Sequence, residues 1–243
     1  LSSGVDSSYV STYFADQKTF TVGFESPDGD RYNEIAYAKD FAETIGVENI
    51  SKVITPEEYW KAFPEIQYHM DEPVADPSAV ALYFVSQLAS KYVKVVCSGE
   101  GADEFFGGYN MYRNAPRYGD NLPTFYAGNT NIMKEDEKRL ILKKYYEDFL
   151  PIDLVKDIYS ENEHLDPLSK MTDVDIQVWL EGDIYLNVDK MSRAAGLEVR
   201  MPLTDLRIFD IASRMPSKFK VNEEENKVAL RTAAAKVLPR EIA

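Results

Sequence analysis

The chain has 243 residues, enough for one large domain or for a domain with a sub-domain. Its 41 acidic residues against 27 Lys and Arg give a formal net charge of −14, so sequence-independent binding of nucleic acid is not expected. The single cysteine, Cys97, excludes an internal disulfide framework, and no apolar run approaches the ~20 residues of a membrane span. We therefore expect a cytoplasmic protein that binds neither nucleic acid nor membranes.

Helical and strand patterns alternate through the first hundred residues. Gly46 is a typical stop signal for the second helix, and Asp76 followed by Pro77 is a capping pair for a later one. The patterns predict helices over residues 5–15, 31–45, from 56 onward and 77–91, and strands over residues 19–24, 49–54 and 93–97.

This alternation implies right-handed crossovers and a mainly parallel sheet covered by helices on both faces. We therefore predict an α/β fold with a doubly wound sheet over residues 1–109. Strand signals vanish over residues 110–172, where Pro, Asn and charged helical stretches such as 135–149 favour a helical insertion or sub-domain. Residues 173–243 are expected to complete the domain, mostly as helices.

The first seven-residue motif, residues 2–8, reads Ser-Ser-Gly-Val-Asp-Ser-Ser. Small residues let backbone N–H groups approach an anion closely, and the helix that follows adds donors and partial positive charge, which indicates a phosphate site. The alternative is a plain strand-to-helix turn with Asp6 in the first helical turn. Such a loop needs an upstream strand to aim it, and the chain begins on the loop at Leu1, so we expect an excised piece.

A second loop of small residues and carboxylates follows the strand at 93–97. Residues 98–104 read Ser-Gly-Glu-Gly-Ala-Asp-Glu, and Phe-Phe-Gly-Gly-Tyr comes next. Ligands of parallel sheets lie beyond the carboxyl ends of the strands, and three nearby acids repel one another unless a cation offsets them. A glycine-rich turn with solvated acids is the alternative. Since Mg²⁺ bridging phosphates needs only one or two carboxylates, Asp6 and Asp103 would suffice.

Three motifs, which occur in order over nearly the whole chain, carry a family resemblance. Residues 2–7 resemble the Ser-Gly-Gly-x-Asp-Ser pyrophosphate loop of the N-type ATP pyrophosphatases, with Ser3 in place of a glycine. Residues 98–109 and the stretch 196–205, Gly-Leu-Glu-Val-Arg-Met-Pro-Leu-Thr-Asp, are similar to the synthetase domain of glutamine-dependent asparagine synthetases. The resemblance implies an adenine nucleotide alpha hydrolase-like fold. We do not expect Ser3, in place of the glycine, to abolish binding of the phosphates by this loop.

The resemblance implies that ATP is split between its α and β phosphates, giving β-aspartyl-AMP and pyrophosphate. Ammonia then attacks the activated carbonyl and releases asparagine and AMP. Residues 2–7 would hold the pyrophosphate, while Mg²⁺ on Asp6 and Asp103 neutralises its charge. The positions that the resemblance assigns to the nucleotide are Leu1, Ser2, Ser3, Gly4, Asp6, Ser7, Val22, Ser98 and Gly99.

Four further residues are assigned to catalysis by the same resemblance. Glu100 would lie beside the acyl-adenylate and accept a proton from the attacking ammonia. Lys190 is a candidate contact to phosphate or substrate, with Glu198 and Arg200 as partners that line the pocket, because an Arg can hold a carboxylate with two hydrogen bonds. The alternative for these charged residues is an exposed or structurally paired side chain.

The family pattern also includes parts that lie outside this sequence. One is an N-terminal glutaminase domain that supplies ammonia, and another is a catalytic lysine soon after the segment matched by residues 238–243. We therefore expect weak binding of ATP and Mg²⁺, no use of glutamine and little synthetase activity. The alternatives are a related amidotransferase, a β-lactam synthetase, or a non-catalytic domain that binds a nucleotide or a protein partner. The sequence leaves a homodimer open.

Overall fold

The computed structural model describes residues 1–14, 16–27, 33–73, 75–129, 133–239 and 242. The described chain forms two compact units, neither of which is continuous in sequence. Residues 184–205 and 230–243 return to pack with the first hundred residues. The first unit comprises Leu1–Gly101, Ile184–Asp205 and Leu230–Ala243, and the second comprises Ala102–Asp183 and Leu206–Ala229.

Two parallel strand pairs lie in the first unit. Strands β1 (Lys18–Phe24) and β2 (Glu48–Ile54) pair along seven residues, and β3 (Val95–Cys97) pairs with β4 (Glu198–Arg200). The predictions of β1, β2 and β3 are confirmed, whereas β4 falls in a segment that was expected to be helical. A mixed α/β fold with parallel sheets is thus present, but the described residues form two two-stranded sheets rather than one doubly wound sheet.

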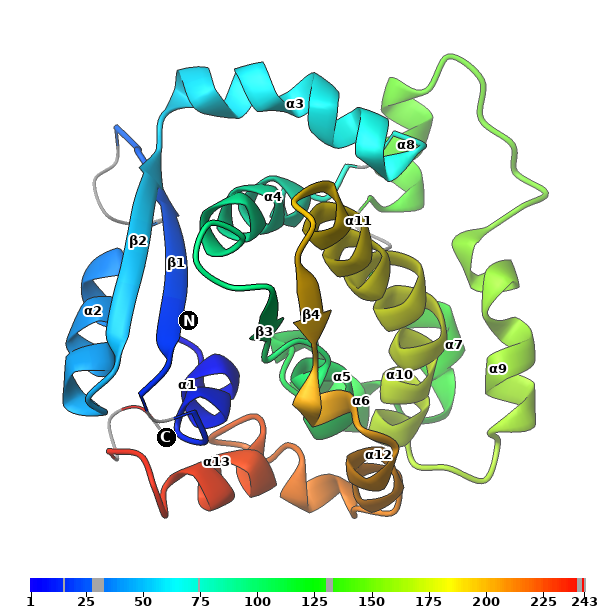
Figure 1. The fold of residues 1–243 in the computed structure, drawn as a ribbon. Coiled ribbons are helices and arrows are strands. Elements are labelled where there is room, and N and C mark those ends of the chain that lie inside the picture. Colours follow the sequence, from blue (N-terminus) through cyan, green and yellow to red (C-terminus); the bar gives the residue numbers. More distant parts are fainter. Residues whose placement is uncertain (15, 28–32, 74, 130–132, 240–241, 243) are drawn as a thin grey trace. The chain divides into compact units, whose positions relative to one another are not determined.

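Helices cover both sides of the β1–β2 ribbon. Helix α2 (Ile35–Thr44) lies on one side and α4 (Ser78–Ala89) on the other, and both contact the two strands (Figure 1). The helix predicted over residues 31–45 is confirmed over Ile35–Thr44, which buries Ile35, Ala38, Phe41 and Ala42, and residues 31 and 32 lie outside the described part of the chain. Helix α3 (Pro56–Met70) begins with a capping box between Thr55 and Glu58, and α11 (Leu186–Ala194) packs on α3 and α4.

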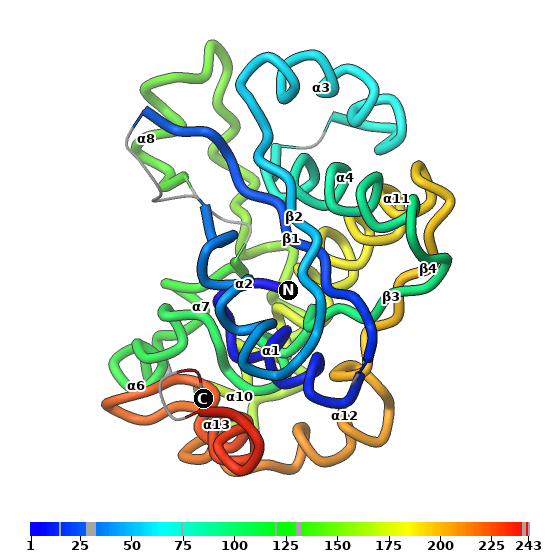
Figure 2. The backbone as a smooth tube through the Cα atoms, turned by 60° about the vertical axis from the view of Figure 1, so that its left-hand side comes forward, coloured from blue at the N-terminus to red at the C-terminus, as the bar shows by residue number. Residues whose placement is uncertain are grey.

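The start of the chain runs beside β1 (Figures 1 and 2). The carbonyl of Leu1 accepts a hydrogen bond from Thr21 Oγ1 at 2.8 Å, and α1 (Val5–Ser11) follows. One buried cluster joins side chains from around both strand pairs, and it includes Phe20, Leu88, Ala89 and Leu197.

The second unit is helical in its described parts. Its core contains the carboxylate of Asp175, which accepts hydrogen bonds from Tyr112 Oη at 2.6 Å, from the Tyr126 hydroxyl, and from the Asn129 N–H at 2.9 Å. The helix expected over 135–149 ends at Ile141, since this helix buries none of its residues and gains no packing from extension. The α-helices are α5 (Ala102–Phe106), α6 (Ala115–Tyr118), α7 (Leu122–Phe125), α8 (Glu135–Ile141), α9 (Lys156–Glu161), α10 (Pro167–Asp175) and α12 (Leu206–Ser213).

Two helical segments pass from one unit to the other. A π-helix, Ile176–Tyr185, follows α10, and α13 (Val228–Ala234) leads back into the first unit. Short 3₁₀ turns occupy Asn110–Asn114, Gly119–Asn121, Pro151–Leu154, Pro202–Thr204 and Ser217–Phe219.

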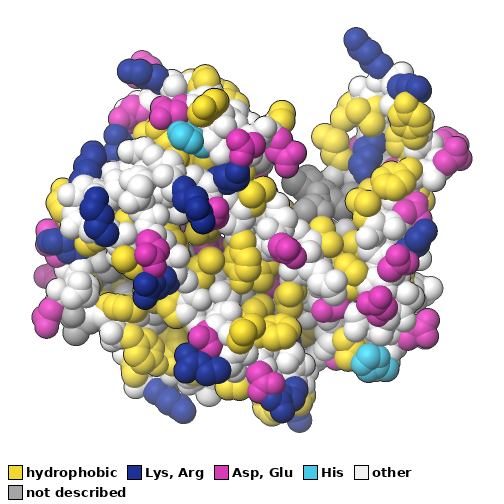
Figure 3. Space-filling model, turned by 45° about the vertical axis from the view of Figure 1, so that its right-hand side comes forward, with side chains coloured by type: hydrophobic (Ala, Val, Ile, Leu, Met, Phe, Trp, Pro, Cys, Tyr) yellow, Lys and Arg dark blue, Asp and Glu magenta, His cyan; other side chains and the backbone are white. Residues whose placement is uncertain are grey.

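The surface mixes charged and apolar side chains. On the face drawn in Figure 3, Lys and Arg side chains are scattered among acidic and apolar ones. Within the described residues, no helix has both the length and the apolar character that a membrane crossing requires.

Candidate functional site

The first small-residue loop folds back on its own hydroxyl groups. The Ser2 N–H donates to Ser7 Oγ at 3.0 Å, the two hydroxyl oxygens of Ser2 and Ser7 lie 2.8 Å apart, and the Gly4 N–H donates to Ser2 Oγ at 3.2 Å. Asp6 lies in the first turn of α1, where a carboxylate is favoured by the helix dipole. The structure therefore brings Ser2, Gly4 and Ser7 together in one compact turn.

A carboxylate of the protein itself occupies the donors of Ser3. The Ser3 N–H donates to Glu34 Oε2 at 3.0 Å, and Ser3 Oγ donates to Glu34 Oε1 at 2.6 Å. The loop thus holds an anion, and a phosphate oxygen that is to reach these donors must displace Glu34. Sequence reasoning missed Glu34, because nothing in the pattern connects residues 31 positions apart.

The second loop packs directly against the first. A Cβ atom placed on Gly99 would lie 2.7 Å from the backbone nitrogen of Ser7 and 2.9 Å from Asp6 Cβ, which is closer than van der Waals contact allows. Only glycine fits without displacing the neighbouring loop. Ser98 anchors the second loop to β4, since its N–H donates to the Arg200 carbonyl at 2.9 Å. Residues from both loops therefore meet at Asp6 and Ser7.

Two of the residues assigned to the nucleotide lie at β1. Leu1 is bonded to the strand as described above, and Val22 is a half-buried residue of β1 whose side chain packs against the core around Phe20. Glu100 follows Gly99, and its N–H donates to Ser98 Oγ at 3.3 Å.

Asp103 lies in α5 of the second unit and is paired with a cation. Its Oδ1 atom is 2.8 Å from Lys227 Nζ, and the exposed fraction of the Asp103 side chain is 33%. Within the described residues, no group of three or more His, Cys, Asp and Glu side chains forms a ready-made metal site. Mg²⁺ needs fewer, because it keeps water ligands and takes oxygens from bound phosphates. Asp6 and Asp103 each carry hard carboxylate oxygens, the kind of ligand that Mg²⁺ prefers.

Glu104 is buried rather than solvated. Only 1% of this residue is exposed, Tyr109 Oη donates to Glu104 Oε1 at 2.6 Å, and Trp179 Nε1 donates to Tyr109 Oη at 2.9 Å. Burial raises the pKa of the Glu104 carboxyl to about 7. The acids of this motif are therefore not equivalent, and Glu104 belongs to the packing of the second unit.

The other charged candidates form ion pairs within the first unit. Lys190, on α11, is paired with Asp71, which follows the last turn of α3, and the hydrogen bond from Lys190 lowers the pKa of Asp71. Arg200 Nε lies 2.8 Å from Glu198 Oε1, one strand period away on β4, and both side chains are exposed. Through its backbone, Arg200 also lies beside Ser98. Strand β4 therefore contacts the second loop through Arg200. The contact described for Lys190 is with Asp71 and not with this loop.

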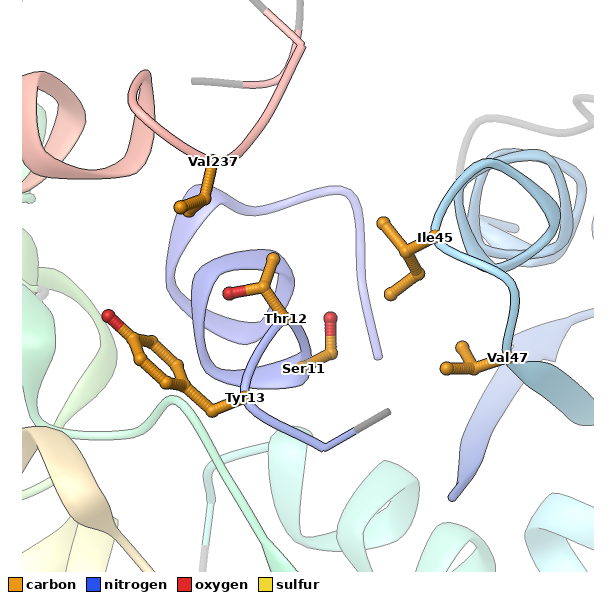
Figure 4. Close-up of a pocket in the computed structure, with 6 residues that line it drawn as sticks. All are labelled: Ser11, Thr12, Tyr13, Ile45, Val47 and Val237. Carbon is orange, nitrogen blue, oxygen red and sulfur yellow. The ribbon is translucent and has the colours of Figure 1, made fainter. Parts of the chain in front are cut away.

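A separate pocket lies beyond the carboxyl end of α1, away from the loop that precedes this helix (Figure 4). It holds about 280 Å³ and contains none of the residues predicted for the nucleotide. Its lining residues are Ser11, Thr12, Tyr13, Ile45, Val47 and Val237.

Comparison with known proteins gives this arrangement a family. The family model described as asparagine synthase matches residues 1–243, the whole chain. The chain belongs to the asparagine synthase family. It is 38% identical over 280 aligned residues to the glutamine-hydrolyzing asparagine synthetase 1 of Bacillus subtilis, covering all of this chain and 44% of that protein. It is 35% identical over 277 residues to a putative glutamine-hydrolyzing asparagine synthetase of Mycobacterium bovis, covering 98% of this chain and 42% of that protein.

This asparagine synthase family chain therefore spans less than half the length of the curated relatives that it matches. The resemblance carried by the three motifs is confirmed by a match that extends over the whole sequence, including the helical parts that lack a motif. Segments such as residues 110–172 contain no motif that identifies the family on its own.

Proposed function

We propose that this chain binds ATP together with magnesium and activates aspartate as β-aspartyl-AMP, which ammonia then converts to asparagine. Family membership and the names of the relatives support this choice of reaction. The observation that carries it is the close approach of Gly99 to Asp6 and Ser7, which makes one site of two loops. Either loop alone would be an ordinary glycine-containing turn.

Each loop has its own part in the proposed site. The N–H groups and hydroxyls of residues 2–7 bind the β and γ phosphates, and they leave their present acceptors, Glu34 among them, to do so. Leu1, Val22, Ser98 and Gly99 contact the rest of the nucleotide, largely through backbone groups. Asp6 and Asp103 hold magnesium, which supplies charge neutralisation for the departing pyrophosphate.

The aspartate end of the site is assigned to four charged residues. Ammonia bonds to the carbonyl carbon through its nitrogen lone pair and AMP leaves, while Glu100 accepts the proton that the positively charged nitrogen gives up. Arg200 and Glu198 orient the substrate from β4, and Lys190 contacts phosphate or substrate. Since Lys190 and Arg200 are now held by Asp71 and Glu198, substrate binding must exchange these ion pairs.

The remaining proposals concern the wider protein. We propose that the two parallel strand pairs belong to one doubly wound sheet, because both contribute to the core around Phe20 and Leu197 and helices lie on both sides of the β1–β2 pair. We further propose that residues 110–172 form a helical sub-domain, and that a glutaminase domain supplies the ammonia, as the names of the relatives suggest. We also propose a cytoplasmic location, because a single cysteine without a disulfide framework fits a reducing compartment.

The proposal is tested by calorimetric titration of the chain with ATP in the presence of Mg²⁺. Asp103→Asn removes one proposed metal ligand and is expected to weaken ATP binding about tenfold or more, since a charge-assisted contact is worth about 1.5–3 kcal/mol. Asp157→Asn is the matched control, because Asp157 is an exposed acid of the same unit. Equal ATP affinity in the two variants, or no binding by the wild type, would contradict the proposed function.

A further inference from the structure

The ion pair between Lys227 and Asp103 is unusually enclosed for a lysine. Only 9% of the Lys227 side chain is exposed, and its Nζ lies 2.8 Å from Asp103 Oδ1. Lysine is almost never buried to this extent unless it is paired, because a buried ammonium loses its hydration. The cation is therefore held at Asp103 by the fold rather than placed there by chance.

Gly108 provides the room for this pair. A Cβ atom on Gly108 would lie 1.8 Å from Asp103 Oδ1 and 2.1 Å from Lys227 Cε, so any side chain at this position would displace one partner. The Gly108 N–H also donates to the backbone carbonyl of Asp103 at 2.8 Å, which holds the glycine next to this residue. The second glycine of the Phe-Gly-Gly-Tyr motif is thus explained by the ion pair.

The backbone that carries Lys227 is itself fixed. The preceding residue, Asn226, donates through Nδ2 to the Gly108 carbonyl at 2.8 Å and accepts from Arg113 Nε at 2.8 Å. Asn226 also forms an antiparallel bridge with Val221. Lys227 has a φ of 57°, in the left-handed region that a lysine rarely adopts. Such a conformation persists only where the surroundings impose it, and it is common at functional sites.

We propose that Lys227 is a built-in counter-ion that competes with the divalent cation for Asp103 and thereby makes metal binding depend on the nucleotide. This inference rests on the proposed function, which assigns Asp103 to magnesium. An ammonium beside the carboxylate repels a second cation, so the bare metal ion binds weakly. The phosphates of ATP bring the negative charge that allows a metal ion and Lys227 to lie near one carboxylate. The metal therefore enters with ATP rather than before it.

The test measures binding of Mn²⁺ to the whole chain in the absence of nucleotide, with free Mn²⁺ followed by its electron paramagnetic resonance signal. Lys227→Met removes the competing charge and is expected to tighten Mn²⁺ binding about tenfold or more. Lys227→Arg keeps the charge and is expected to bind Mn²⁺ as weakly as the wild type. An unchanged or weaker affinity in Lys227→Met would overturn the inference.

Two further variants keep the result interpretable. If Lys227→Met does not fold, Lys227→Gln, which keeps a hydrogen-bond donor without the charge, must show the same gain. The double variant Asp103→Asn/Lys227→Met must lose that gain, and a gain that persists would place the Mn²⁺ elsewhere and overturn the inference. The proposed function has a separate readout, because it fails when the wild type does not bind ATP with Mn²⁺, whatever Lys227→Met does to bare Mn²⁺.

Discussion

Ser3 and Glu34 show that the loop proposed to bind phosphate already binds a carboxylate of the protein itself. Their two hydrogen bonds, at 3.0 and 2.6 Å, use the donors that a phosphate oxygen would need. Asp103 and Lys227 form the complementary case, with a protein cation at a carboxylate assigned to a metal. Under the proposed function, a bound metal ion and triphosphate would replace these two partners, so ligand binding would exchange existing contacts at Ser3 and Asp103.

A substitution at Gly99 tests whether ATP binding needs the close contact between the two loops. In Gly99→Ala the new methyl group would lie 2.7 Å from Ser7 N, so one loop must shift, at a cost of about 1–3 kcal/mol. We expect ATP affinity in the presence of Mg²⁺ to fall at least about tenfold, as measured by calorimetry. Gly182→Ala is the control, because its methyl group would meet no atom within 4 Å. Equal losses of affinity in both variants would contradict a contact-specific effect.

Helix α10 illustrates how one side chain sets the start of an element. Asp166 accepts hydrogen bonds from the N–H groups of Leu168 at 3.1 Å and Ser169 at 3.3 Å, and its oxygens lie 2.6 Å from the hydroxyl oxygens of Ser169 and Ser217. Burial alone would raise the pKa of Asp166, but these hydrogen bonds outweigh it and hold the pKa below 3.8. The ionised form is therefore the one that caps the helix.

Replacing this cap gives a pH-dependent prediction. Asp166→Ala is expected to lower the free energy of unfolding by about 1 kcal/mol at neutral pH, measured by urea denaturation, with Asp157→Ala as the exposed control. Because the folded-state pKa is depressed, the contribution of Asp166 is complete above its unfolded value of 3.8 and is lost as the pH falls through the folded value. A difference between wild type and variant that grows in acid would contradict this cap.

Elements with a strong local pattern could be predicted, and those made by distant pairing could not. Strands β1 and β2 are rich in β-branched or aromatic residues, and α2 carries its buried residues at helical spacing. Strand β4 has three residues, and its partner β3 lies about a hundred residues earlier, so nothing local distinguishes it. Helix α8 ends at Ile141 rather than near residue 149, and none of its residues is buried. Such a lack of packing cannot be recognised from the local sequence.

The candidate site divides in the same way. Residues 2–7 and 98–104 were predictable because each is a contiguous motif with small residues and carboxylates. Glu34 and Lys227 were not, since each reaches its partner from 31 and 124 positions away. The ion pair of Glu198 with Arg200 was left open as an alternative, and these two residues are indeed paired in the structure.

At the scale of the whole molecule, the net charge of −14 makes the surroundings repel a free triphosphate on average. The proposed binding of ATP must therefore rest on local hydrogen-bond donors and on a cation that accompanies the nucleotide. We propose above all that residues 2–7 bind the β and γ phosphates of ATP.

The most direct measurement is a crystal structure of the chain with Mg²⁺ and an ATP analogue whose α,β bridge is a methylene group. The account predicts β and γ phosphate oxygens within hydrogen-bond distance of the N–H groups of residues 2–7, with Glu34 released from Ser3. Phosphates bound elsewhere, or Glu34 still bonded to Ser3 in the presence of the bound nucleotide, would contradict it.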